Sequence, residues 1–167
     1  MGSAWAIKRE SPIHELPFPF RRHFSAATPP LVAVVVSSDA EIQAAMAEIL
    51  RGCSLTSVPA SGFEGLKAIY SKAAPIACIC GFDLADGTFL DVVDFLDEQT
   101  NHVPAIMVSP RSLQNTPMCF VESLRAGALA TICYPYRLSD VQLMLWSVIQ
   151  YQHESRHPTV RTKNSIR

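Results

Sequence analysis

Charged side chains are scarce in this sequence, and the signals of several common protein classes are missing. Only 17% of the 167 residues are charged and the formal net charge is −1, so the chain as a whole is not biased toward nucleic acid or an anionic membrane. No apolar run approaches the ~20 residues that a membrane-spanning helix needs. The first residues lack the apolar centre of a signal peptide. We therefore expect a cytoplasmic protein that binds neither nucleic acid nor membrane.

Cysteine pairs of the C-x-x-C type are also absent. The sequence has five cysteines, Cys53, Cys78, Cys80, Cys119 and Cys133. Most of them lie in apolar runs, where a free cysteine behaves as a small hydrophobic residue. This pattern argues against zinc and for a reducing compartment, and we expect neither a metal nor a cofactor.

Apolar residues, by contrast, make up 49% of the chain. Five short runs are apolar at nearly every position, which is typical of parallel strands buried on both faces. These runs are residues 31–36, 53–58, 76–80, 103–108 and 130–134. Five amphipathic helices are predicted between and after them, and two of these begin at the capping pairs Ser61 with Glu64 and Thr88 with Asp91. The pattern predicts an α/β fold, a doubly wound (βα)5 parallel sheet in the flavodoxin-like order 2-1-3-4-5.

The predicted domain spans residues 31–153. Residues 1–30 contain five prolines and are predicted to be a flexible extension. A role of its aromatic and basic stretch 18–24 in binding nucleic acid or a partner protein stays open. Residues 154–167 are basic and predicted to be disordered. We expect no DNA-binding output domain after Gln152.

The residues that follow the strands are predicted to meet in one cleft, because ligands bind at the carboxyl ends of parallel strands. They are Ser37, Ser38, Gly81, Ser109, Tyr134 and Pro135. None is charged, and we expect Gly81 to open into solvent.

Four stretches in this order resemble the receiver domain of two-component response regulators. They are residues 35–42 (VVSSDAEI), 84–87 (LADG), 125–128 (RAGA) and the pair Tyr134-Pro135. The resemblance covers roughly residues 31–152. It implies an acidic pair that holds Mg²⁺, an aspartate that accepts a phosphoryl group, a serine or threonine, and a lysine before a proline, usually in a cis peptide.

This chain departs from that pattern at most of these positions. The acidic pair falls on Ser37 and Ser38, the acceptor on Gly81 and the lysine on Tyr134, while Ser109 and Pro135 keep the pattern. Hydroxyls are poor ligands for Mg²⁺, and glycine offers no atom to phosphorylate. The resemblance therefore implies a degenerate receiver, or pseudo-receiver, without enzymatic activity, which binds a signalling partner independently of phosphorylation.

Two other functions stay open. Asp83, two residues past the acceptor position, is an alternative phosphoacceptor if the third strand is re-registered. The uncharged cleft is an alternative site for a small organic ligand. Asp39 and Asp86 are interpreted as helix-start and turn residues.

Two surfaces remain for partners. No lysine or arginine occurs from Ala74 to Pro110, so the third helix carries an acidic face that is either solvated or docks a basic partner. The last helix is apolar on more than one side. We expect Trp146 to anchor a homodimer there, and the alternative is packing under the N-terminal extension.

Overall fold

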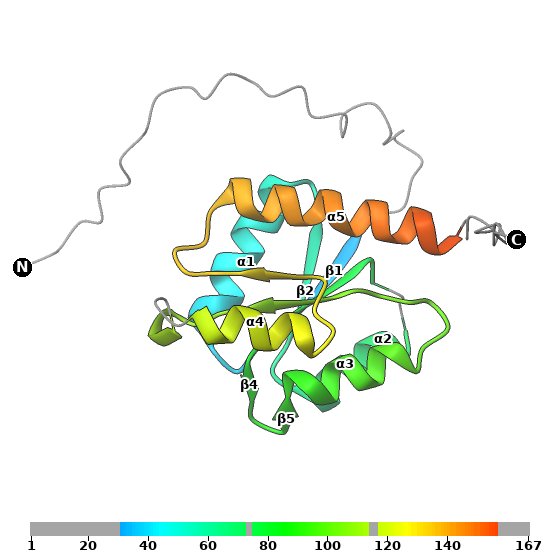
Figure 1. Ribbon diagram of the computed structural model, residues 1–167, viewed down its shortest axis with the longest axis horizontal. Coiled ribbons are helices and arrows are strands. Elements are labelled where there is room, and N and C mark those ends of the chain that lie inside the picture. The colour runs from blue at the N-terminus through cyan, green and yellow to red at the C-terminus, as the bar shows by residue number, and fades with distance from the viewer. Residues whose placement is uncertain (1–30, 73–74, 114–116, 157–167) are drawn as a thin grey trace, which may run out of the picture.

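The computed structural model describes residues 31–72, 75–113 and 117–156 of the chain, and Figure 1 shows its arrangement. The predicted N-terminal extension and residues 157–167 of the predicted tail lie outside these ranges. The last helix runs to Arg156, so residues 154–156, assigned to the tail by sequence, are helical. Within the described ranges, no helix is both long and apolar enough to span a bilayer.

Five parallel strands form a single sheet in the order β2-β1-β3-β6-β7. They are β1 (Val32–Val36), β2 (Thr56–Ala60), β3 (Ala77–Gly81), β6 (Ala105–Val108) and β7 (Ala130–Ile132). The predicted fold class and strand order are confirmed. The largest error in strand position is in β2, which begins three residues later than expected. The preceding helix extends to Gly52, and a turn with Ser54 at a φ of 60° separates the two elements.

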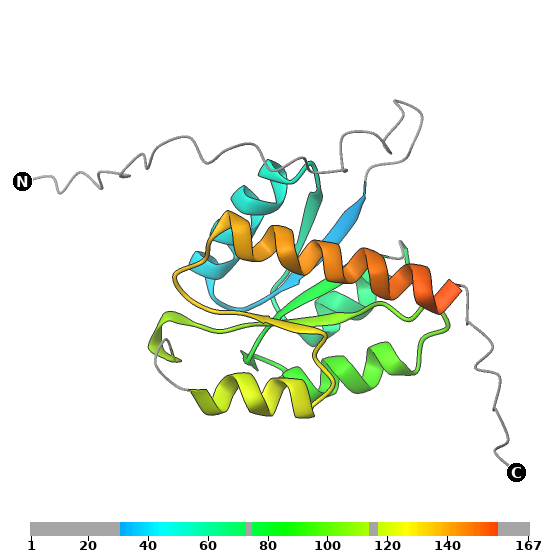
Figure 2. The same ribbon diagram turned by 45° about the horizontal axis from the view of Figure 1, so that its top comes forward.

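Helices cover both faces of the sheet (Figures 1 and 2). They are α1 (Ala40–Gly52), α2 (Phe63–Tyr70), α3 (Phe89–Asp97), α4 (Pro117–Arg125) and α5 (Leu138–Arg156). Side chains alternate along each strand. In β1, Ala33 and Val35 pack in the cluster with α1 and α5, while Val34 and Val36 pack in the cluster with α2 and α3. This double burial explains why the strands are apolar at every position.

A small hairpin, not predicted from sequence, follows β3. Strands β4 (Asp83–Leu84) and β5 (Gly87–Thr88) pair in antiparallel fashion around the predicted turn at Asp86. The Asp86 carboxylate accepts hydrogen bonds from the backbone N–H groups of Phe63 and Glu64, at 2.6 and 3.0 Å. It therefore caps α2 from 23 residues away along the chain.

The predicted cap of α2 by Ser61 and Glu64 is wrong, because the N-cap position is Gly62 and the distant Asp86 provides the acceptor instead. The predicted capping box of α3 is confirmed. Thr88 Oγ1 accepts from the Asp91 N–H, and the Asp91 carboxylate accepts from the Thr88 N–H at 2.7 Å. The hairpin is thus tied to α2 by Asp86 in its turn and to the start of α3 by the capping box at Thr88.

Candidate functional site: the carboxyl edge of the sheet

The carboxyl ends of β1, β3 and β6 bring Ser37, Gly81 and Ser109 together, as the sequence predicts. Val36 pairs with Cys80, and Gly81 pairs with Val108, so the residues after these pairs lie at one edge. Ser37 and Ser109 are each only 2% exposed. These three residues of the predicted site are therefore buried.

The two serines at the acidic-pair positions differ in their environment. Ser37 is buried, and its Oγ accepts a hydrogen bond from the Asp39 N–H at 3.1 Å. Its carbonyl accepts from Gln43 Nε2 at 2.6 Å, and that amide also reaches the Ala60 carbonyl at 3.1 Å. Ser38 is exposed. Ser37 is thus held by neutral hydrogen bonds within the chain.

Gly81 does not open into solvent, and that expectation was wrong. The residue is buried. A Cβ placed on it would lie 3.3 Å from Ser37 Oγ and 3.7 Å from the Val36 carbonyl, so the space that a side chain would enter is already bounded by β1. Sequence could not show this, because it depends on how closely the ends of β1 and β3 approach.

Ser109 is held by a residue that the sequence reasoning missed. The Tyr136 hydroxyl donates a hydrogen bond of 2.9 Å to the Ser109 carbonyl. Burial raises the pKa of Tyr136 to about 12, and the nearby carboxylates of Asp39 and Glu41 act in the same direction. The hydroxyl therefore stays protonated and keeps donating. The only hint in the sequence is a second tyrosine just past Tyr134-Pro135.

Tyr134, at the lysine position of receivers, precedes Pro135 in a cis peptide. Its ring meets Tyr136 edge to face, with centroids 5.4 Å apart. The guanidinium carbon of Arg111 lies 5.3 Å from the centroid of the Tyr134 ring. None of the six predicted residues is charged, but charged groups lie nearby: Arg111 lies over the Tyr134 ring, and Asp39 and Glu41 raise the pKa of Tyr136.

The three carboxylates weighed as substitutes lie in different places. Asp39 is the N-cap of α1, and its side chain accepts from the Glu41 N–H at 2.8 Å. Asp86 caps α2, which lowers its pKa through the hydrogen bonds from Glu64 and Phe63. Asp83 is exposed and pairs with Thr88 in the hairpin, beyond the end of β3. The described part of the chain contains no group of three or more His, Cys, Asp or Glu side chains placed to hold a metal.

The cysteines with described side chains are free, and two of them are deep in the core. Cys78 and Cys80 are fully buried. Burial raises the pKa of Cys80 to about 12 and that of Cys78 well above its usual value. Both are therefore unreactive thiols that pack as hydrophobic residues.

The two sides of α5 are distinct. Val141, Met144, Leu145 and Val148 are buried against the sheet, whereas Leu143 is 69% and Trp146 42% exposed. On α4, Phe120, Val121 and Leu124 are also exposed. In both views α4 and α5 flank β7, the edge strand of the sheet (Figures 1 and 2). Trp146 is therefore not part of the core in the described residues.

No protein-family model matches the sequence, and no curated protein is significantly similar to it. Solved structures of receiver domains do share its fold. A response regulator from Chloroflexus aurantiacus superposes with a TM-score of 0.66 at 16% identity, over 73% of this chain and 99% of the other.

The signal receiver domain of an HD domain-containing protein from Pseudomonas fluorescens gives a TM-score of 0.67 at 13% identity, over 82% and 99% of the two chains. The chemotaxis protein CheY4 of Vibrio cholerae gives 0.62 at 16% identity, over 72% and 99%. The chain thus has the fold of a response-regulator receiver domain.

Proposed function

We propose that this chain is a receiver-type signalling module that acts without phosphorylation, as a protein-interaction domain in a reducing, cytoplasmic setting. One observation carries the proposal. Gly81, at the end of β3, provides no carboxylate, and a side chain there would crowd Ser37. The module has no catalytic residues of its own and signals through what it binds.

The chemistry of the edge supports the same conclusion. Phosphoryl transfer needs an acceptor oxygen, and it needs cations that neutralise the charge building up on the transferred group. The position of the acidic pair holds Ser37, whose hydroxyl is occupied by the Asp39 N–H. The lysine position holds Tyr134, whose ring contacts Tyr136 and Arg111. Arg111 alone would have to replace both a metal and a lysine.

Beryllofluoride with Mg²⁺ tests the proposal, because this anion mimics an aspartyl phosphate. We expect the melting temperature of the full chain to be the same with beryllofluoride and Mg²⁺ as with Mg²⁺ alone. Occupancy at one hundred times the dissociation constant would add ~2.7 kcal/mol to the free energy of unfolding, which is easily seen as a shift. A shift that Asp83→Asn abolishes would establish Asp83 as a phosphoacceptor and overturn the proposal.

The partner surface that we propose consists of the exposed apolar side chains of α4 and α5 beside β7, and we propose that a second copy of the chain binds there. Exposed apolar patches of a few hundred Å² usually mark partner surfaces, and large aromatic residues dominate their energetics. Trp146, at 42% exposure, is the largest side chain on this surface of α5. Burying it in a dimer would remove the apolar surface from water.

Sedimentation across a concentration series tests the dimer. Trp146→Ala is expected to weaken association by ~2 kcal/mol or more, with folding preserved, because the buried side chains of α5 are untouched. Leu90→Ala is the matched control, since Leu90 is 55% exposed but lies on α3. A monomer at every concentration, or a Trp146→Ala protein that unfolds, would contradict the dimer.

A further inference from the structure

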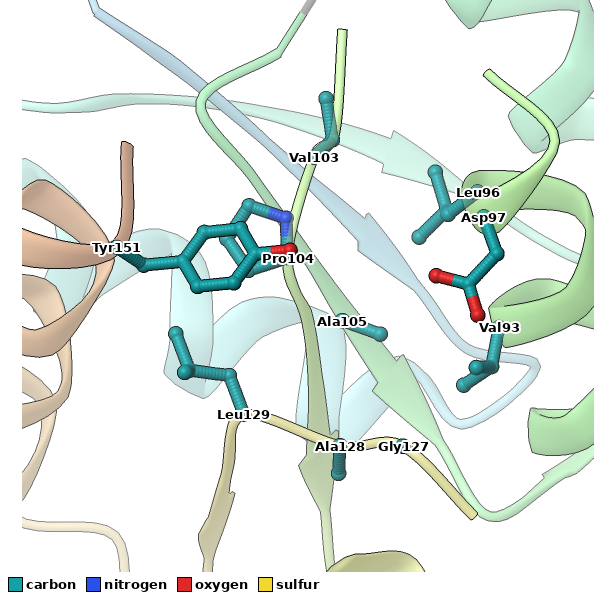
Figure 3. A pocket seen from close by; sticks show the side chains of 10 residues that line it. All are labelled: Val93, Leu96, Asp97, Val103, Pro104, Ala105, Gly127, Ala128, Leu129 and Tyr151. Carbon is teal, nitrogen blue, oxygen red and sulfur yellow. The ribbon is translucent and has the colours of Figure 1, made fainter. Parts of the chain in front are cut away.

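A pocket of about 200 Å³ opens at the amino edge of the sheet, opposite the receiver-like cleft. It lies where β6 and β7 begin, between the end of α3 and the last turns of α5 (Figure 3). Small residues leave the space open, namely Ala105, Gly127 and Ala128. Gly127 has a φ of +97°, and a Cβ there would lie 3.0 Å from Val93 Cγ1. The loop after α4 thus approaches α3 in a way that only glycine allows.

Apart from Asp97 and Tyr151, the side chains that line the pocket are apolar. Val93, Leu96, Val103, Pro104 and Leu129 provide the apolar surface. The ring of Tyr151 lies on one side, and the carboxylate of Asp97 points into the space from the other (Figure 3). A flat ring, a carboxylate and apolar walls form a combination that suits a cation on an apolar stem.

The charges around the opening favour the same ligand. Asp94, Asp97 and Glu98 are all exposed on the end of α3, and that helix has no basic residue in its last turn. The carbonyl groups at a helix C-terminus add a partial negative charge. In the described ranges, the one ion pair joins Lys67 to Glu64, so Asp97 is left without a cation. The basic residues nearest in sequence to the lining are His102, directly before Val103, and Arg125, in the last turn of α4.

We infer that this pocket binds an arginine side chain of a basic segment in a partner protein. The pocket is smaller than the ~300–1,000 Å³ of most small-molecule sites, and its size suits a single side chain. Asp94 and Glu98 extend the acidic surface beyond the pocket, where they would meet residues flanking that arginine. Guanidinium is favoured over ammonium because it stacks on a ring and pairs with a carboxylate in one plane.

The inference rests on the proposed function only in requiring a protein partner. It concerns the opposite edge of the sheet from the beryllofluoride test, so each result can be interpreted without the other. A failed peptide titration leaves the phosphorylation-independent module intact. A beryllofluoride shift leaves the arginine pocket intact.

The test is a titration of the ¹⁵N-labelled full chain with a blocked pentapeptide that has arginine at its centre and glycine elsewhere. We expect saturable shifts of the backbone amide signals of Ala105, Gly127 and Ala128, weakened by added salt. The same peptide with citrulline, which is uncharged, should bind more weakly by about fivefold or more.

Variants of the chain make the test specific. Asp97→Asn and Tyr151→Leu should each weaken binding by about fivefold or more. Asp83→Asn removes the same charge at the other edge and should leave binding unchanged. Thermal unfolding confirms that each variant is folded, and Asp97→Lys provides a second exposed substitution that should abolish binding. Equal binding of the citrulline peptide, equal losses in Asp97→Asn and Asp83→Asn, or shifts confined to other residues would each overturn the inference.

Discussion

The two edges of the sheet differ in how their polar groups are satisfied. At the carboxyl edge, Ser37 and Ser109 are buried and hydrogen-bonded to Gln43, Tyr136 and backbone groups. At the amino edge, small residues leave a pocket, and the Asp97 carboxylate has no ion pair among the described residues. The polar groups at the carboxyl edge are thus satisfied within the chain, whereas the amino edge has a pocket beside an exposed carboxylate.

Each edge contains a glycine, Gly81 after the central strand β3 and Gly127 before the outer strand β7, and the two glycines have different roles. Gly127 is required by its backbone conformation, since φ is +97°. Gly81 has no such requirement and is limited only by the nearby Ser37 hydroxyl. Substitutions at the two positions should therefore lower the free energy of unfolding by different amounts.

The largest effect is expected from Gly127→Ala, which should lower the free energy of unfolding by about 3 kcal/mol, because left-handed strain adds to overpacking against Val93. Urea unfolding measures it. Gly52→Ala is the control, since a Cβ there would lie 3.7 Å from Leu138 in ordinary contact, and it should cost little. Equal costs at both positions would show that the amino edge does not depend on this turn.

Gly81→Asp should lower the free energy of unfolding by about 2 kcal/mol through crowding at a buried position. It should not restore phosphate uptake from a small phosphodonor, because Ser37 and Ser38 provide no metal site. Gly81→Ala should cost less, and Ser37→Gly in the Gly81→Asp background should recover part of the loss. Phosphate incorporation by the single variant would show that the missing acidic pair is not the limiting defect.

Tyr136→Phe should lower the free energy of unfolding by about 1 kcal/mol, the usual net contribution of one hydrogen bond. Tyr134→Phe is the control. The tyrosine pKa is raised from 10.0 to about 12 on folding, so the unfolded chain loses this proton first, and stability should fall as pH rises from about 10 to 12. Tyr136→Phe should remove that part of the alkaline slope. If the stability of Tyr136→Phe falls with rising pH as steeply as that of the parent, the hydroxyl does not make the hydrogen bond to Ser109.

Asp86→Asn should have the smallest effect. Because it weakens the cap on α2, it should lower the midpoint of urea unfolding and leave unchanged the slope of the free energy of unfolding against urea concentration. The pKa of Asp86 is lowered in the fold, so its contribution is present above the unfolded-state pKa and is lost as pH falls through the folded value. The difference in stability between the variant and the parent should therefore shrink as pH falls below about 4. Asp94→Asn is the exposed control, and a difference that persists in acid would contradict the capping role.

The sequence by itself determined the elements of the sheet. Short runs that are apolar at nearly every position and alternate with amphipathic helices are typical of a parallel sheet covered by helices on both faces. The capping box of Thr88 and Asp91 could also be predicted from sequence, because the two residues are only three positions apart. The absence of a carboxylate at Gly81 follows directly from the residue type.

Only the tertiary structure decided which distant groups meet. Asp86 caps a helix that begins 23 residues earlier, Tyr136 reaches the carbonyl of Ser109 27 residues away, and Gly81 is closed off by a neighbouring strand. Trp146 lies outside the core because the buried side of α5 is already occupied by four other side chains. Such contacts depend on how elements approach in space, and local sequence patterns report only what residues prefer along their own segment.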